Sequence, residues 1–138
     1  MDFVFIFEVA EWEFLKYFMS QYIIISKGTE LLRFPIDLLV YIESDGNYSY
    51  VVTHDGRKAL VTMQLGQLED ILNSQLGDNV NNIVRLGRGL IINTNYVHQI
   101  DIARQRLVLS DCDGCWHELS ASRIALTQLK TLIDKADD

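Results

Sequence analysis

The fold of this 138-residue chain is constrained most strongly by two Asp-Gly pairs. Each pair lies between runs rich in β-branched and aromatic residues. Asp55-Gly56 separates residues 48–53 from 57–61, and Asp113-Gly114 separates residues 106–111 from 116–119. Asp-Gly supplies the positive backbone φ angles that tight two-residue turns require. Both pairs therefore predict antiparallel β-hairpins.

The rest of the chain after residue 20 also consists mainly of short apolar runs separated by turn residues. A turn is expected at Lys27-Gly28, a helical turn at 35–39 and a loop at 45–47. Further strands are expected where short apolar runs stand between turns, at 21–26, 30–34, 40–44, 83–86, 90–92 and 97–103. Most of the domain is therefore predicted to consist of short strands.

Two segments instead carry apolar residues at helical spacing. Thr62 is expected to cap the first helix, and either Ser120 or Ser122 to cap the second. The residues expected to be buried are Leu65, Leu68, Ile71, Leu72 and Leu76 in the first helix and Ile124, Leu126, Leu129, Leu132 and Ile133 in the second. The predicted class is mainly β, with two helices inside the domain.

Residues 1–18 form a separate segment that is predicted to be an amphipathic helix. Its apolar stripe consists of Phe3, Phe7, Ala10, Phe14, Tyr17 and Phe18. Such a helix can pack on its own domain or stand outside the functional module. It can equally form a dimer or dock a protein partner, and the sequence leaves these alternatives open.

The formal net charge of −7 argues against a nucleic-acid-binding protein, because such proteins usually present a basic surface. Residues 1–18 carry −3 and residues 134–138 carry −2, so the two ends hold −5 and the rest of the chain −2. Within residues 85–130, six basic residues face four acidic ones. The central part can therefore present a modest positive face.

The segment Arg85-Leu-Gly-Arg-Gly-Leu-Ile-Ile-Asn93 places two arginines on a glycine-flanked bend before an apolar run. A guanidinium offers a planar fork of donors that matches phosphate oxygens or the acceptor edge of guanine. Glycine on both sides of Arg88 allows the backbone to approach a ligand closely. The segment therefore predicts a nucleic-acid contact, although many surface loops carry arginine and glycine.

The sequence gives little support for an enzyme or a metal site. Cys112 and Cys115 could form a redox switch or, with His117, half of a zinc site, but a second pair of ligands is missing. We expect two reduced cysteines. His54, His98 and His117 match no nucleophile or metal spacing, and no phosphate-binding glycine motif, GxSxG or HExxH is present. We therefore expect a non-enzymatic protein with no metal, cofactor or small-molecule substrate.

Neither a secretory signal nor a membrane span is evident at the N-terminus. The beginning of the chain is acidic, and glutamates interrupt its apolar stretch. The longest uncharged run near the N-terminus, from Tyr17 to Ser26, is too short to span a bilayer. A cytoplasmic protein that does not enter the membrane is expected.

Several segments, in order, resemble the LytTR DNA-binding domain of bacterial response regulators and related transcription factors. They are residues 37–43, Gly46-Asn-Tyr48, Asp55-Gly56, the leucine-rich helix, Arg85-x-x-Arg88, residues 91–93 with 96–97, and Leu119-x-x-Ser122-Arg123. The resemblance covers about residues 19–133. It divides the chain into the helical segment 1–18 and a LytTR-like domain at 19–138.

The resemblance implies an elongated stack of small antiparallel sheets with short helices, which reads double-stranded DNA through loops placed in successive major grooves. Its DNA-contacting positions fall on Asn47, Tyr48, Ser49, Arg85, Arg88, Ser122 and Arg123, with Lys58 and Thr62 as further phosphate contacts. Arginine can pair with guanine and asparagine with adenine, each through two hydrogen bonds. A helix N-terminus such as that at Ser122 attracts phosphate.

The chain also departs from the family pattern. Gly87 and Gly89 stand where the family usually has His and Ser, and residues 1–18 are too few to form a phosphorylatable receiver domain. We expect a sequence-specific transcriptional regulator, binding as two copies on repeated half-sites. The alternative is a LytTR-like protein-interaction module with little DNA affinity that docks a partner through the N-terminal helix.

Overall fold

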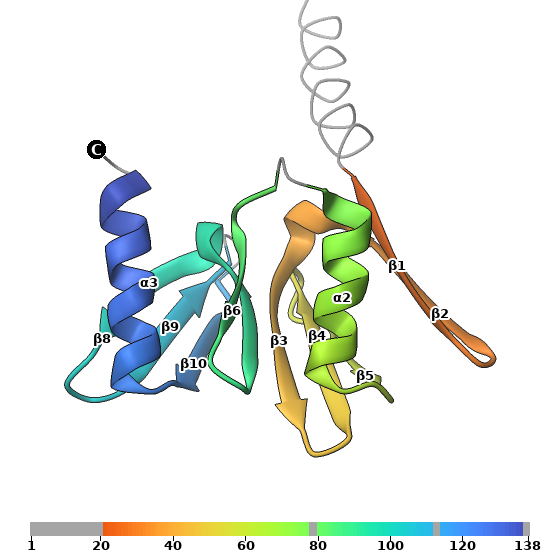
Figure 1. Ribbon diagram of the computed structural model, residues 1–138, viewed down its shortest axis with the longest axis horizontal. Helices are drawn as coiled ribbons and strands as arrows, with labels where there is room; N and C mark the ends of the chain where they lie inside the picture. Colours follow the sequence, from red (N-terminus) through yellow and green to blue (C-terminus); the bar gives the residue numbers. More distant parts are fainter. Residues whose placement is uncertain (1–20, 78–79, 112–113, 137–138) are drawn as a thin grey trace, which may run out of the picture. The chain divides into compact units, whose positions relative to one another are not determined.

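The computed structural model describes residues 21–77, 80–111 and 114–136, which form ten strands in three antiparallel sheets (Figure 1). The predicted mainly β class is confirmed. The predicted N-terminal helix at 1–18 and Cys112 lie outside the described residues. Among the helices of the described ranges, none is long and apolar enough to cross a lipid bilayer.

The first compact unit, up to Leu38, contains a two-stranded sheet. Strands β1 (Tyr22–Lys27) and β2 (Glu30–Pro35) pair across a turn in which Gly28 has a φ of 61°. The predicted helical turn follows as the 3-10 helix η1 (Ile36–Leu38). This unit is a simple hairpin, as the Lys27-Gly28 turn predicts.

The second unit, from Leu39 onward, contains a five-stranded antiparallel sheet in the order β5-β4-β3-β7-β6. Its strands are β3 (Leu39–Asp45), β4 (Tyr48–Thr53), β5 (Lys58–Val61), β6 (Ile83–Leu86) and β7 (Leu90–Asn93). The Asp55-Gly56 hairpin joins β4 to β5 as predicted, and Gly56 has a φ of 81°. The pairing of β3 with β7 brings together segments that are far apart in sequence.

A three-stranded sheet in the order β10-β9-β8 completes this unit. It consists of β8 (Val97–Asp101), β9 (Arg106–Ser110) and β10 (Trp116–Ser120), and the 3-10 helix η2 (Thr94–Tyr96) leads into it. One apolar cluster joins the two sheets and the last helix, and it includes Val40, Val52, Ile92, Leu107, Leu109, Leu119, Leu126 and Leu129. The loop ends of the strands are therefore held by a continuous core.

Of the two α-helices in the described ranges, the first begins later than the residue pattern predicts and the second begins as predicted. Helix α2 (Leu65–Leu76) is preceded by Gln64, whose backbone amide donates a hydrogen bond of 3.0 Å to the side-chain Oε1 of Gln67. The prediction of Thr62 as its cap is therefore wrong, because the helix begins two residues later than that cap requires. Ser122 does cap the last helix, and its Oγ accepts a hydrogen bond of 3.1 Å from the amide of Ala125.

The buried face of the last helix, α3 (Arg123–Ala136), is also narrower than predicted. Leu126 and Leu129 are buried as expected and Ile133 packs against the core, but Ile124 is 74% exposed and Leu132 is 46% exposed. Ala125 occupies the core position in the first turn instead. In α2 the expected face is confirmed except for Ile71, which is only half-buried.

Candidate nucleic-acid interface

The sheet register places the turns of two hairpins at the same edge. In the β3–β4 hairpin Asp45 pairs with Tyr48, and across the sheet Glu43 pairs with Leu90 at the start of β7. The amide of Ser44 donates a hydrogen bond of 2.9 Å to the carbonyl oxygen of Gly89. The β3–β4 turn and the β6–β7 loop therefore lie side by side (Figure 1).

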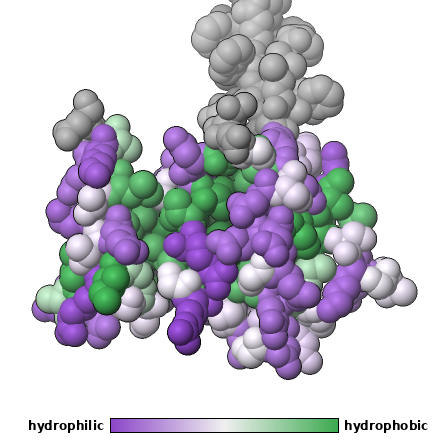
Figure 2. Space-filling view, in the orientation of Figure 1, coloured by the Kyte–Doolittle hydropathy of each residue, from purple (hydrophilic) through white to green (hydrophobic). Residues whose placement is uncertain are grey.

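The β6–β7 loop presents Arg88 to solvent. Leu86 and Leu90 on either side of the loop are buried, whereas Arg88 is exposed. Its guanidinium makes no hydrogen bond or ion pair to any residue that the structure describes. Figure 2 shows hydrophilic side chains gathered at the end of this hairpin. The five donors of the Arg88 guanidinium are therefore available to a ligand.

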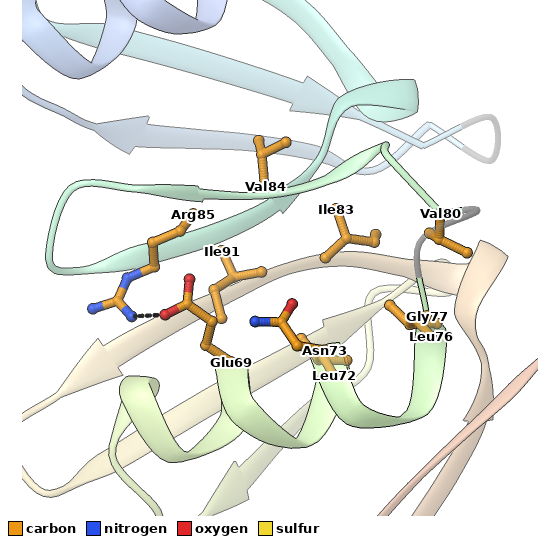
Figure 3. A pocket seen from close by; sticks show the side chains of 10 residues that line it. All are labelled: Glu69, Leu72, Asn73, Leu76, Gly77, Val80, Ile83, Val84, Arg85 and Ile91. Atoms are coloured by element: carbon orange, nitrogen blue, oxygen red, sulfur yellow. Dashed lines mark hydrogen bonds and ion pairs between the residues drawn. The ribbon is translucent and has the colours of Figure 1, made fainter.

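Arg85 is placed differently, with its guanidinium folded back on its own loop. Its Nε donates to the carbonyl oxygen of Gly87 at 3.0 Å, and its Nη2 donates to that of Arg88 at 3.2 Å. Its Nη1 forms an ion pair of 3.1 Å with Oε1 of Glu69 on α2 (Figure 3). In this conformation Arg85 supports the loop rather than reaching outward.

Asn47 lies at the tip of the β3–β4 hairpin, beside Gly46, whose φ is 64°. Its Oδ1 accepts a hydrogen bond of 3.2 Å from Nε2 of Gln64, the residue before α2. This contact orients the side-chain amide of Asn47 and leaves its Nδ2 group as an outward donor. Tyr48, next in the chain, is 47% exposed and extends the same tip.

The start of α3 borders the β6–β7 loop. A shallow, solvent-open hollow of about 440 Å³ is lined by residues 86–90 on one side and by Ser120, Ala121, Ser122 and Ala125 on the other. Ser122 and Arg123 are both exposed. Nη2 of Arg123 donates to the carbonyl oxygen of Ala103 at 3.2 Å, which holds this guanidinium at the β8–β9 turn.

Two predicted residues do not present their side chains at this edge, one because it is buried and one because it lies at the other end of its sheet. Ser49 is fully buried, and its hydroxyl donates to the carbonyl oxygen of Met63 at 2.8 Å, so its side chain is not offered to a ligand. Lys58 pairs with Val52 in the sheet register, at the other end of β4 from the tip, and its Nζ lies 4.4 Å from the centre of the Tyr50 ring.

Thr62, by contrast, lies close to the tip. It directly follows Val61, which pairs with Ser49 next to the β3–β4 turn, and its side chain is exposed. The structure therefore places six predicted residues at or beside these adjacent loops: Asn47, Tyr48, Thr62, Arg85, Arg88 and Ser122. Arg123 follows Ser122, but its guanidinium is held at the β8–β9 turn.

Sequence reasoning missed two residues that contact this site, Gln64 and Glu69. Both lie at the start of α2, and each contacts a residue of the predicted set that is 16 or 17 positions away in sequence. The spacing Gln64-x-x-Gln67 before a leucine-rich run resembles a capping box and could have indicated the helix start. It gives no indication of the contact with Asn47.

The described ranges contain no cluster of three or more His, Cys, Asp or Glu side chains placed to hold a metal ion. Cys115 lies near the Asp55-Gly56 turn, because a Cβ built on Gly56 would be 3.3 Å from its Sγ. His117 packs edge-on against Tyr41 with 5.2 Å between ring centres, and His98 packs against Trp116 at 4.5 Å. These three residues thus make packing contacts.

Comparison with known proteins agrees with the fold and with the resemblance inferred from the residues. The sequence model of the LytTr DNA-binding domain family matches residues 29–134. A solved structure described as the LytTr DNA-binding domain of a methyl-accepting/DNA response regulator from Bacillus cereus is similar in fold, with a TM-score of 0.57 and 16% sequence identity. The match covers 83% of this chain and 97% of that one.

Curated proteins provide no match to this sequence. The family model nevertheless spans well over half of the chain, and the structure is similar in fold to the solved domain. The chain belongs to the LytTr DNA-binding domain family.

Proposed function

We propose that this chain is a transcriptional regulator that binds double-stranded DNA sequence-specifically through the loops at one edge of its second unit. The hydrogen bond from Ser44 to Gly89 carries this proposal, because it fixes the tips that bear Asn47 and Arg88 next to each other. A duplex can then meet both side chains at once. The solved domain from Bacillus cereus is itself named a DNA-binding domain.

Each exposed group at this edge has a matching DNA group. Arg88, with all its donors available, can pair with O6 and N7 of guanine. Asn47 presents Nδ2 as a donor to a base acceptor, since its Oδ1 is held by Gln64. The amide groups at the start of α3, beside Ser122 and Arg123, suit a phosphate.

Tyr48 and Thr62 lie close enough to the tip to contact the sugar-phosphate backbone. Lys58, at the other end of β4, would contact a phosphate farther along the duplex. Arg85 contributes by holding the loop, and the Ser49 side chain supports β4 from inside. We further propose that two copies occupy repeated half-sites in the cytoplasm of a bacterial cell, without cofactor or metal.

Selection of genomic duplex fragments with the purified chain, followed by titration of the best fragment at several salt concentrations, tests the proposal. Binding through phosphates releases counterions, so the logarithm of the association constant should fall linearly as the logarithm of salt concentration rises. A mutated fragment should bind more weakly than the selected one. A chain that enriches no fragment and shows no salt dependence would instead act as a protein-interaction module.

A further inference from the structure

The conformation of the β6–β7 loop depends on one side chain beneath it. Arg85 donates to two consecutive carbonyl oxygens, those of Gly87 and Arg88, at 3.0 and 3.2 Å. Gly87, which carries the first of these oxygens, has a φ of 59°, which lies in the region that favours glycine. Because one guanidinium binds both carbonyl oxygens, it fixes the orientation of the peptide units on either side of the Arg88 side chain.

Glu69 in turn fixes that guanidinium. Its Oε1 accepts the third hydrogen bond of Arg85 at 3.1 Å, and the two side chains are 36% and 27% exposed. Figure 3 shows Arg85 reaching from β6 toward Glu69 on α2, with Asn73 on the next turn of the helix. Without the carboxylate, the guanidinium would keep only its contacts with the loop and lose the one that fixes it to α2.

A small, partly open hollow lies between α2 and β6 next to the ion pair (Figure 3). Glu69, Asn73 and Arg85 line it together with apolar residues of α2, β6 and β7. The ion pair between Glu69 and Arg85 therefore joins α2 to β6 beside this hollow.

We propose that Glu69 is a positioning residue for the DNA contact of Arg88, acting through Arg85. This inference rests on the proposed function. The same helix also orients Asn47, because Gln64 directly precedes α2 and donates to the Asn47 amide at 3.2 Å. Helix α2 thus sets the geometry of both reading loops without contacting DNA itself.

The test compares Glu69→Ala with Asp70→Ala, which removes the same charge from the neighbouring exposed position of α2. The measurement is the ratio of dissociation constants between the selected duplex and the duplex altered at the base pair read by Arg88. In the unmodified chain this ratio should be about tenfold or more. Glu69→Ala should reduce it to near the value for Arg88→Ala, whereas Asp70→Ala should leave it unchanged.

A double mutant shows whether Glu69 acts through Arg88. In the Arg88→Ala background, Glu69→Ala should cause no further loss of preference at that base pair, because residues that act through one contact are not additive. The melting temperature of Glu69→Ala should remain close to that of Asp70→Ala, since partly exposed ion pairs contribute little to stability.

Two results would overturn the inference while leaving the proposed function in place. One is an unchanged preference in Glu69→Ala. The other is tighter binding of Glu69→Ala to all duplexes, which would mean that Glu69 merely masks Arg85 as a phosphate contact. If the unmodified chain shows neither preference nor salt-dependent binding, the proposed function fails and this inference fails with it.

Discussion

The amide nitrogen of Ser44 lies 2.9 Å from the carbonyl oxygen of Gly89 and donates a hydrogen bond to it. Ser44 precedes the β3–β4 turn by one residue, and Gly89 ends the β6–β7 loop. This backbone contact extends the pairing of β3 with β7 up to the two loops and holds them side by side. Changes on either loop should consequently affect how the other meets DNA.

Arg88→Ala should weaken binding to the selected duplex by about 1–3 kcal/mol and relax preference at one base pair. The reason is that an exposed guanidinium without partners among the described residues can pair with a guanine edge. Titration against duplexes carrying each base pair at that position measures the effect. Equal weakening on all duplexes would mean that Arg88 contacts only phosphate.

Arg57→Ala provides the control for this experiment. Arg57 is 85% exposed and pairs with Asp55 at the β4–β5 turn, which lies at the opposite end of β4 from Asn47. Removing its charge should leave base preference unchanged and alter affinity only slightly. A loss comparable to that of Arg88→Ala would place the DNA contact elsewhere.

Ser122→Asp should weaken DNA binding without destabilising the fold. Aspartate caps helices as well as serine does, so the hydrogen bond from the Ala125 amide should persist. Its negative charge would repel a phosphate at the start of α3. Thermal unfolding and duplex titration separate the two effects.

Ser122→Ala should instead affect stability more than DNA binding. The free energy of unfolding should fall by about 1 kcal/mol, because the helix loses its cap. If Ser122→Asp binds DNA as tightly as the unmodified chain, no phosphate lies at this helix end.

Gly89→Ser should strengthen DNA binding by about 0.5–1.5 kcal/mol, since it adds a hydroxyl where the family usually has serine. A Cβ at Gly89 would lie 3.6 Å from Oγ of Ser44, an ordinary contact distance, and the backbone there needs no positive φ. Titration of the selected duplex measures the gain.

Gly87→Ser makes the matched comparison. Position 87 also has open space for a Cβ, but its φ of 59° strains other residues, so this change should reduce the free energy of unfolding by about 1 kcal/mol. Equal stability of the two variants would show that the loop relaxes without cost.

Tyr41→Phe should make the fold more resistant to alkaline pH. Burial raises the pKa of Tyr41 above its usual value near 10, and the charge of Glu43 raises it further. Below pH 10 the phenol is neutral in both folded and unfolded chains. Above pH 10 the unfolded chain loses this proton first, so stability falls as pH rises through the folded pKa.

Urea unfolding at pH 8 and pH 11 tests this prediction. The free energy of unfolding should fall less between the two pH values in Tyr41→Phe than in the unmodified chain. Tyr48→Phe, which alters an exposed tyrosine at the hairpin tip, is the control. A fall of the same size in all three proteins would contradict the prediction.

Local hairpins were predictable because their signals lie in adjacent residues. Asp55-Gly56 and Lys27-Gly28 indicated turns that the structure contains. The pairing of Glu43 with Leu90 was not predictable in this way, because no local property of either strand specifies a partner so distant in sequence. The resemblance to a known family implied a stack of small antiparallel sheets, but it did not specify this pairing.

Individual side chains at the site were harder to predict than the loops that carry them. Ser49 alternates with exposed Tyr48 along β4 and so turns inward to Met63, although both residues follow the same turn. Arg85 differs from Arg88 because it remains on β6, within reach of Glu69. Such roles depend on tertiary neighbours that sequence spacing does not reveal.

The separation between tip and core has an evolutionary consequence. Arg88 stands on a short loop whose flanking residues, Leu86 and Leu90, are buried, so the loop can exchange its outward side chain without disturbing the interior. Under the proposed function, mutations there would change the base sequence that is read while leaving the free energy of unfolding nearly unchanged. Paralogues of such a domain could thus acquire separate regulons through a handful of substitutions.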